Sequence, residues 1–392
     1  MPDLTKKLSN RSVVQIINTL IQTAIEQNVS DIHLEPFESM FRVRFRLDGV
    51  LQDTARIEPY HREPVISRVK IMAGLDIAEK RRPQDGRIRV NHNKSSIDLR
   101  VSSLPTAFGE KIVLRVLDKG SLNLDLEELG FEREDLTIFR RNIHLPYGMI
   151  LVTGPTGSGK TTTLYSALRE LNTEQVNITT IEDPIEYNLN GITQTQVHSE
   201  IDLTFSSILR SILRQDPNII MLGEIRDGET AKIAVRAALT GHMVLSTLHT
   251  NDAPSAVARL KDIGVEPFLI SSSVRMIVAQ RLVRRVCVNC KSSRLPLEQE
   301  LKSLGIDSFE GEFAVGNGCE ECNNTGFRGR VSLFEIMEVT DDISELIISD
   351  TNSSDLKAAA KHAGMTSLRD IGIQKITQGI TTPEEVLRET TI

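Results

Sequence analysis

Residues 154–161 read Gly-Pro-Thr-Gly-Ser-Gly-Lys-Thr and match the pattern G-x-x-x-x-G-K-[ST] of a phosphate-binding loop. Its glycines allow the backbone to wind tightly, so that N–H groups converge on phosphate oxygens, and a helix N-terminus adds positive potential. Lys160 is expected to reach the β- and γ-phosphates and Thr161 to bind Mg²⁺. The residues predicted to bind nucleotide here are Gly154, Pro155, Thr156, Gly157, Ser158, Gly159, Lys160, Thr161 and Thr162.

Three other apolar stretches end in side chains suited to phosphoryl transfer. They are 178–181 before Glu182, 218–222 before Gly223 and Glu224, and 243–248 before His249. Glu224 follows the position of the usual metal-binding aspartate, so it is the first candidate to hold the magnesium shell and polarise the attacking water. Glu182 is the second candidate for that base. His249 could sense the γ-phosphate or could be structural.

Two arginines lie one turn apart in the helix predicted over residues 203–215. Arg210 and Arg214 are spaced i, i+4, so their side chains share one face. A guanidinium donates bidentate hydrogen bonds to phosphoryl oxygens, so this pair could neutralise phosphate or bind a neighbouring subunit. A pair of solvated surface arginines fits the same spacing.

All four cysteines fall in one short stretch with the spacing CxxC–x28–CxxC: Cys287, Cys290, Cys319 and Cys322. Paired knuckles of this kind place four thiolates around Zn²⁺, and a site with four protein ligands is structural. The central gap exceeds the usual ribbon spacing, but closing a loop of that length costs little extra entropy. Disulfides are not expected, because no signal peptide opens the chain. A redox CxxC is the alternative, although no thioredoxin-like unit surrounds either pair.

The elements expected to hold the phosphate site alternate between strands and helices from about residue 130. The apolar stretch 149–153 precedes the loop, and the three stretches named above follow it. Helices are predicted at 160–171, 203–215, 229–239 and 254–263. This alternation predicts an α/β fold with a parallel sheet and crossover helices, whose carboxyl edge carries the site. Short helices, including 341–349 and 366–378, are predicted after about residue 335.

Residues 1–118 are predicted to form a separate α+β domain. Helices are expected at 12–27 and 63–75, and strands from Phe41 and at 87–91, 96–102 and 111–117, with a turn at 91–94 and a linker at 119–123. This part holds 19 basic and 15 acidic residues, whereas the remainder holds 27 and 38. The bias is either ordinary variation or a way to present arginines to an anion held by the acidic part.

The composition excludes several classes of protein. A chain of 392 residues with 40% hydrophobic and 25% charged residues is typical of a globular protein with two or three domains. It has no apolar run of the ~20 residues that a membrane-spanning helix needs. A net charge of −7, with no tryptophan and four tyrosines, disfavours nucleic-acid binding.

With these segments in hand, the chain resembles the secretion ATPases of type II secretion and type IV pilus assembly (the GspE/PilB kind) along nearly its whole length. The matching motifs are Ser30-Asp-Ile-His-Leu-Glu-Pro, Arg44-Phe-Arg-Leu-Asp-Gly, Arg82-Pro-Gln-Asp-Gly-Arg87, Leu99-Arg-Val-Ser, Gly109-Glu-Lys-Ile-Val-Leu-Arg115, the phosphate-binding loop, the aspartate box at 182–186, Gly223-Glu-Ile-Arg-Asp227 and the histidine box at 240–251. Residues 191–196 and 266–273 look more like the type II secretion branch.

The resemblance implies a RecA-like ATPase core at 119–282, an N-terminal PAS-like α+β domain at 1–118, a tetracysteine zinc subdomain at 283–334 and a helical C-terminal subdomain at 335–392. It implies a hexameric ring that uses ATP, Mg²⁺ and Zn²⁺ at the cytoplasmic face of the inner membrane. The ring would act on a membrane platform protein to assemble a pseudopilus. Arg100 and Arg115 would reach the γ-phosphate, with Arg210 and Arg214 as further phosphate or interface arginines.

Members of the secretion branch usually carry a further N-terminal domain that docks on a membrane-anchored partner. The chain begins with the domain that follows it, so it is either a truncated chain or a short member of the family, and the sequence does not predict recruitment by that route. Two other functions fit a RecA-like core: a nucleic-acid motor, and a nucleotide-regulated scaffold with little turnover. Against the motor stand the net charge, the scarcity of aromatic residues and the lack of a recognisable nucleic-acid module.

Overall fold

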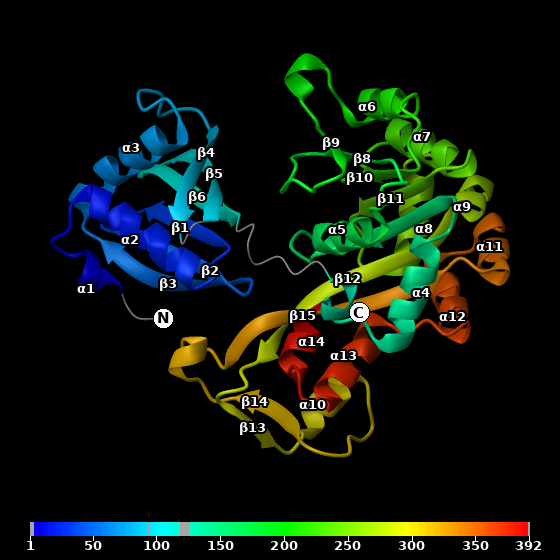
Figure 1. Cartoon of the computed structure of the whole chain (residues 1–392). Coiled ribbons are helices and arrows are strands. Elements are labelled where there is room, and N and C mark those ends of the chain that lie inside the picture. The colour runs from blue at the N-terminus through cyan, green and yellow to red at the C-terminus, as the bar shows by residue number, and fades with distance from the viewer. Residues whose placement is uncertain (1–3, 93–94, 118–124, 391–392) are drawn as a thin grey trace. The chain divides into compact units, whose positions relative to one another are not determined.

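The computed structural model describes residues 4–92, 95–117 and 125–390, which form two compact units (Figure 1). The first unit comprises Met1–Leu122 with Gly318–Arg328, and the second comprises Asn123–Asn317 with Gly329–Ile392. Part of the turn predicted at 91–94 and the linker predicted at 119–123 lie outside the described residues. The two units are described separately.

The first unit contains a six-stranded antiparallel sheet in the order β3-β2-β1-β6-β5-β4. Its strands are β1 (Asp31–Pro36), β2 (Phe41–Leu47), β3 (Val50–Ile57), β4 (Gln84–His92), β5 (Ser95–Thr106) and β6 (Gly109–Leu117). The helices are α1 (Thr5–Leu8), α2 (Val13–Glu26) and α3 (Arg62–Ala73), with a short 3-10 turn, η1 (Pro59–His61). Ser12 begins α2 through a capping box with Gln15.

Strict alternation along β2 gives this sheet two different faces. Phe41, Val43 and Phe45 are buried in the core that α2 and α3 cover, while Arg42, Arg44 and Arg46 occupy the alternate positions. Side chains of a strand alternate between faces, so the arginines project from the face opposite those helices. The helices and strands predicted in this part are therefore observed, whereas α1, β1 and β3 are elements that the sequence pattern did not reveal.

The second unit contains a seven-stranded sheet in the order β15-β12-β7-β11-β10-β8-β9. Its strands are β7 (Gly148–Thr153), β8 (Ile178–Glu182), β9 (Thr193–Gln196), β10 (Ile219–Leu222), β11 (Met243–Leu248), β12 (Val274–Val286) and β15 (Phe327–Glu338). The strands from β12 to β9 pair in parallel, which confirms the predicted α/β fold.

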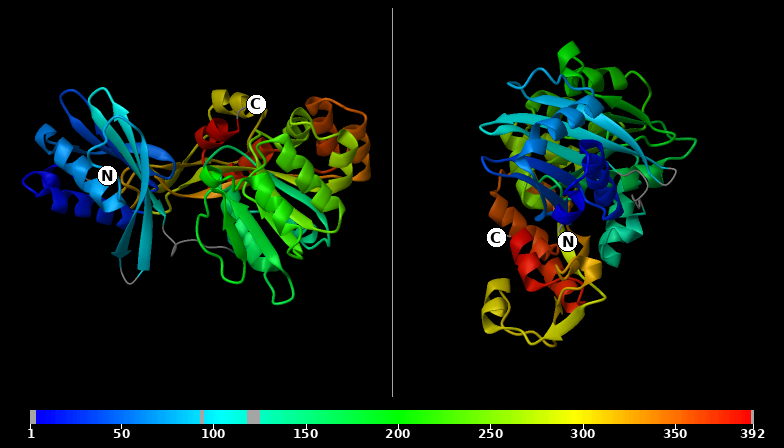
Figure 2. Two further views of the ribbon diagram at one scale, coloured as in Figure 1. Left: turned by 90° about the horizontal axis from the view of Figure 1, so that it is seen from above. Right: turned by 90° about the vertical axis from the view of Figure 1, so that its left-hand side faces the viewer.

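Helices cover both faces of this sheet. One core gathers α4 (Arg133–Ile143) and α5 (Lys160–Leu171) with the 3-10 turn η2 (Leu126–Glu128). The other gathers α6 (Phe205–Ile212), α7 (Gly228–Leu239), α8 (Ala253–Asp262), α9 (Pro267–Ser273), α11 (Asp341–Ile348), α12 (Ser353–His362) and α13 (Leu368–Thr377). Figure 2 shows α11 and α12, in orange, packed on α9 and α8. The helices α11, α12 and α13 thus pack in the core of this sheet.

A smaller part carries the cysteines. It contains β13 (Lys291–Arg294) paired antiparallel with β14 (Phe313–Gly316), together with α10 (Glu298–Leu304), η4 (Glu320–Cys322) and α14 (Pro383–Glu389). A further 3-10 turn, η3 (Ser199–Ile201), precedes α6. The boundaries predicted at 282/283 and 334/335 each fall inside a strand, the first in β12 and the second in β15.

None of the helices in the described ranges combines the length and the apolar character needed to cross a bilayer.

Candidate nucleotide and zinc sites

The phosphate-binding loop connects β7 to α5, as its sequence predicts. Gly157 and Gly159 have φ values of +84° and +90°, a region that favours glycine, and Gly159 is the N-cap of α5. At Gly154, a Cβ atom would come within 2.5 Å of the Gln280 carbonyl oxygen, so only glycine fits. Local backbone geometry therefore requires three of the loop's glycines.

Two polar side chains of this loop fit phosphate oxygens. Lys160 is buried and its Nζ donates to the carbonyl oxygens of Gly154 (2.8 Å) and Pro155 (3.0 Å). Ser158 Oγ is buried and has no hydrogen-bond partner among the described residues. Burial, together with the charge of Arg281, lowers the pKa of Lys160 to about 8, although Glu224 opposes the shift. An ammonium and an unpaired hydroxyl at a helix N-terminus suit a phosphate group.

Strand register brings the other candidate residues to the same edge of the sheet. Leu248 pairs with Thr153, the last residue of β7, and Leu222 pairs with Ser246 and Ile181. His249, Gly223 and Glu182 are the next residues of their strands, so they emerge beside the loop. The expectation that these strand ends converge is confirmed.

Glu224, the first candidate for the catalytic base, contacts Arg226 and His249. Its Oε1 accepts a hydrogen bond from Arg226 (2.5 Å), and its Oε2 is 3.4 Å from His249 Nε2. Burial raises its pKa, but the hydrogen bond and charge of Arg226 and the charge of His249 outweigh burial and lower it. Glu224 is therefore ionised at neutral pH, the form in which a carboxylate accepts a proton from water.

Glu182 has a different environment, since its oxygens are committed to protein donors. Tyr165 donates its hydroxyl to Oε2, while Thr180 Oγ1 (2.5 Å) and Gln194 Nε2 (3.0 Å) donate to Oε1. The glutamate is buried. Water activation by Glu182 would require part of this network to open, so Glu224 stays the first candidate.

The arginines predicted to reach phosphate pair with protein groups. Arg210 forms an exposed ion pair with Glu229 (2.6 Å), and Arg214 donates to the carbonyl oxygen of Arg210 (2.8 Å). In the first unit, Arg115 Nε lies 2.9 Å from Asp31, and Arg100 lies opposite Arg115 in the β5–β6 register. A phosphate role for these four arginines stays a prediction.

Two residues beside the loop, Gln280 and Arg281, were not predicted from the sequence. Gln280 Oε1 accepts from Thr163 of α5 (2.9 Å), and its Nε2 donates to Ser332 of β15 (3.3 Å). Arg281 is 6% exposed and packs against the loop. The sequence signal that could have revealed them is a polar Gln-Arg pair within the mostly apolar stretch 274–283.

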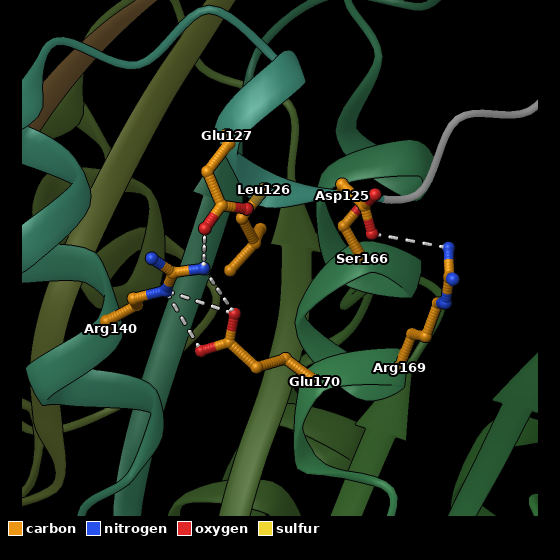
Figure 3. Close-up of a pocket in the computed structure, with 7 residues that line it drawn as sticks. All are labelled: Asp125, Leu126, Glu127, Arg140, Ser166, Arg169 and Glu170. Carbon is orange, nitrogen blue, oxygen red and sulfur yellow. Dashed lines mark hydrogen bonds and ion pairs between the residues drawn. The ribbon is translucent and has the colours of Figure 1, made fainter.

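A surface cavity of about 210 Å³ lies beside the C-terminal half of α5, away from the phosphate-binding loop (Figure 3). Its charged groups pair with one another: Arg140 binds Glu127 and Glu170, and Arg169 binds Asp125. These ion pairs fasten η2 to the C-terminal half of α5. We do not place nucleotide here, because Lys160 begins the opposite end of the helix.

The four cysteines form one cluster, and none is in a disulfide. Their sulfur atoms all lie within 4.8 Å of one another, and Cys319 and Cys322 Sγ are 3.7 Å apart. Tetrahedral zinc with bonds of 2.3 Å implies sulfur separations of about 3.8 Å. The N–H groups of Cys319 (3.2 Å) and Gly326 (3.3 Å) point at Cys322 Sγ. The donor set and its spacing fit Zn²⁺.

Oxygen donors for a hard cation stand at the carboxyl edge. Thr161 is exposed at the start of α5, and Glu224 and Asp183 both contact Arg226. Hydroxyl and carboxylate oxygens, together with phosphate oxygens, are the ligands that Mg²⁺ takes in nucleotide sites. The residues present therefore fit Mg²⁺ beside a polyphosphate.

A sheet of parallel strands with a phosphate-binding loop after β7 and an ionised glutamate two strands away, after β10, defines a P-loop nucleoside triphosphatase. The family model described as "Type II/IV secretion system protein" matches residues 6–388. The chain belongs to this family. It is therefore an ATP-hydrolysing enzyme that uses ATP and Mg²⁺, and the predicted resemblance is confirmed.

Curated relatives agree over almost the whole chain. The type IV pilus assembly ATPase PilB of Myxococcus xanthus is 51% identical over 99% of this chain and 69% of its own length. The type II secretion system ATPase E of Vibrio cholerae is 49% identical over 99% of this chain and 77% of its own. A crystal structure of the pilus retraction motor PilT with bound ADP has a TM-score of 0.63 at 25% identity, covering 96% of this chain and 97% of that one.

Proposed function

We propose that this ATPase powers pseudopilus assembly and protein secretion in a type II secretion system. The observation that carries the proposal is the convergence of Lys160, Glu224 and His249 at one sheet edge, in a chain 49% identical to a type II secretion ATPase. The chain would work in the cytoplasm as a hexameric ring against an inner-membrane platform protein. Membrane association would be peripheral and through such partners.

In the proposed reaction, the loop N–H groups and Lys160 hold the β- and γ-phosphates. Glu224 orients water for in-line attack on the γ-phosphate and accepts its proton, while His249, 3.4 Å from that carboxylate, reports the state of the γ-phosphate. Bound Mg²⁺ neutralises charge that develops on the phosphoryl oxygens. Arg100, Arg115, Arg210 and Arg214 are proposed to supply further positive charge, from the same chain or from a neighbour.

We also propose the division into parts at 1–118, 119–282, 283–334 and 335–392, with Zn²⁺ as the stabilising centre of the third part. Cys287→Ser should release zinc and lower the thermal unfolding midpoint, because a four-thiolate structural site contributes directly to folding. Metal analysis of the purified protein checks the first effect. A full-length protein that contains no zinc and keeps its midpoint in chelator would contradict this part of the proposal.

Genetic complementation tests the cellular function. A deletion strain should lose exoprotein secretion and regain it with the wild-type gene, but not with Lys160→Ala, which removes the phosphate-binding ammonium. Lys302→Ala is a matched control, because Lys302 lies in α10, far along the chain from the loop. Purified Lys160→Ala should have no ATPase activity.

The second candidate is type IV pilus assembly, favoured by the 51% identity to the M. xanthus relative. In that case the deletion would remove surface pili and leave secretion intact. Retention of both pili and secretion, or ATPase activity that depends on single-stranded DNA, would contradict both candidates.

A further inference from the structure

Arg281 places a buried guanidinium beside the phosphate-binding loop. β12 runs parallel to β7 with Ala279 opposite Thr153, so the following residues of the two strands, Arg281 among them, lie along the loop. A Cβ atom at Gly154 would lie 3.2 Å from Arg281 Nη1. The guanidinium therefore packs directly against the first glycine of the loop.

Among the described residues, the acceptors of hydrogen bonds from this guanidinium are oxygens of neutral groups. Nη1 donates to the carbonyl oxygen of Gln280 (3.1 Å), Nη2 to the carbonyl oxygen (2.8 Å) and side-chain Oδ1 (3.4 Å) of Asn251, and Nε to the carbonyl oxygen of Glu389 (3.2 Å). Across residues 4–92, 95–117 and 125–390, no carboxylate oxygen lies within 4.0 Å of it. Arg284 on the same strand, by contrast, is 2.7 Å from a carboxylate oxygen of Glu385.

A buried cation with no carboxylate in direct contact costs free energy, and its site usually has a reason to keep it. Burial is the largest influence on the pKa of Arg281 and lowers it, although the charges of Glu389, Glu335 and Asp252 oppose the shift from a distance. Lys160 is in a similar position, since its two acceptors are also carbonyl oxygens and Glu224 acts on it through charge without direct contact. Gly154 thus lies between two buried cations, with Lys160 bound to its carbonyl oxygen and Arg281 packed beside its Cα.

We propose that Arg281 is a positioning residue of the phosphate site, whose guanidinium holds the first turn of the loop and supplies buried positive charge that the phosphate chain of the nucleotide neutralises. The inference rests on the proposed binding of ATP at residues 154–161. Arg281 lies on β12, a strand that is followed neither by the loop nor by Glu182, Glu224 or His249.

The effect of such a charge depends on how many phosphates face it. Coulomb attraction scales with ligand charge, so removal of the guanidinium charge should weaken ATP most, ADP less and AMP least. The same removal should not destabilise the protein without nucleotide, because it relieves a buried charge that no described carboxylate contacts directly. A merely structural arginine would show the opposite pattern, with lower stability and no dependence on phosphate number.

Calorimetric binding of ATP, ADP and AMP to the full chain, with Mg²⁺, tests the proposal. Arg281→Gln should weaken ATP roughly tenfold, ADP less and AMP within about twofold. Arg281→Lys keeps the charge and should restore the preference for ATP over AMP. Arg285→Gln is the matched control, because Arg285 is an exposed arginine of the same strand. The unfolding midpoint without nucleotide should stay unchanged or rise in Arg281→Gln.

Equal losses for all three nucleotides, or no loss, would overturn the proposal, as would a lower midpoint in Arg281→Gln. If that variant does not fold, Arg281→Met removes the charge with similar volume, and failure of both variants to fold counts against the proposal. The variant Lys160→Ala distinguishes failure of the proposed ATP site from failure of the role proposed for Arg281. If Lys160→Ala binds ATP like wild type, the loop itself is not the site; if it loses ATP while Arg281→Gln does not, only the role of Arg281 is wrong.

Discussion

The sheet of the first unit and the phosphate site bury charge in different ways. In the first unit, three buried carboxylates, Asp31, Glu35 and Asp98, each bind at least two basic side chains of the same sheet. At the phosphate site, the buried cations Lys160 and Arg281 have neutral oxygens as acceptors, although other buried charges of the second unit, such as Glu385, are ion-paired. A self-neutralised cluster stabilises its own sheet, whereas cations that contact neutral oxygens are prepared for an anionic ligand. The difference indicates which charges hold the fold and which bind the substrate.

The strongest test of this contrast is Glu224→Gln, which removes the carboxylate but preserves its shape. Hydrolysis should fall about 10²–10⁴-fold, because the group that accepts the proton from water is lost, while ATP still binds. Steady-state turnover and calorimetric binding check the two halves. Glu229→Gln, an exposed glutamate whose partner is Arg210, is the control. Normal turnover in Glu224→Gln would show that the base has been assigned wrongly.

In the first unit the matching substitution should affect stability instead. Glu35 accepts from Arg44 at 2.7 and 2.8 Å and lies 3.1 Å from both Arg42 and Lys111. Glu35→Gln leaves these cations without their anion and should lower the free energy of unfolding by about 3 kcal/mol. Chemical denaturation followed by circular dichroism measures the loss. Glu38→Gln, at an exposed glutamate, should change nothing, and equal effects of both variants would remove the contrast.

Lowering the pH should remove the stabilising contribution of Glu35 and its basic partners. Burial raises the pKa of Glu35, but hydrogen bonds from Arg44 and Lys111 outweigh it and hold the pKa at about 2, below the ordinary 4.5. A lowered carboxyl pKa stabilises the fold above pH 4.5, and this contribution is lost as the pH falls from 4.5 toward 2. The stability difference between wild type and Glu35→Gln should therefore shrink over that window in denaturation curves. A difference that stays constant with pH would contradict the role given to the ionised form.

The smallest effect is expected at Arg210. Its ion pair with Glu229 is exposed on both sides, and such pairs contribute about 0–1 kcal/mol. Arg210→Ala should leave the unfolding midpoint nearly unchanged, so any large loss of ATPase activity would come from phosphate binding or subunit contact. Comparison of activity with midpoint in one preparation separates these causes. A large drop in midpoint would place Arg210 among the residues that hold the fold.

The phosphate site could be predicted from the sequence because its parts are contiguous. The loop at 154–161 and the polar residues after each apolar stretch are local patterns, and parallel strands bring them to one edge. The cysteine cluster was likewise readable from its spacing. Patterns of this kind need no knowledge of which distant residues become neighbours.

What could not be predicted depends on pairing between distant segments. The Arg115–Asp31 ion pair joins residues 84 positions apart through the β1–β6 register. β12 was not predicted as a strand because charged residues interrupt its apolar pattern. β15 was not predicted because it begins Phe-Arg-Gly-Arg. The role of Arg281 could not be predicted because two of its main-chain acceptors belong to residues 251 and 389, which are distant in sequence from Arg281 and from each other.

The chemistry of those acceptors has a consequence for evolutionary comparison. Every amino acid, proline included, retains its main-chain carbonyl, so substitutions at positions 251, 280 and 389 leave the three main-chain oxygens that hold Arg281 in place. Correlated mutation between alignment columns arises when one side chain must compensate for another. The three main-chain contacts demand no such compensation, so co-variation methods would not detect them. The contact that such methods could detect is the one between Nη2 and Asn251 Oδ1, at 3.4 Å.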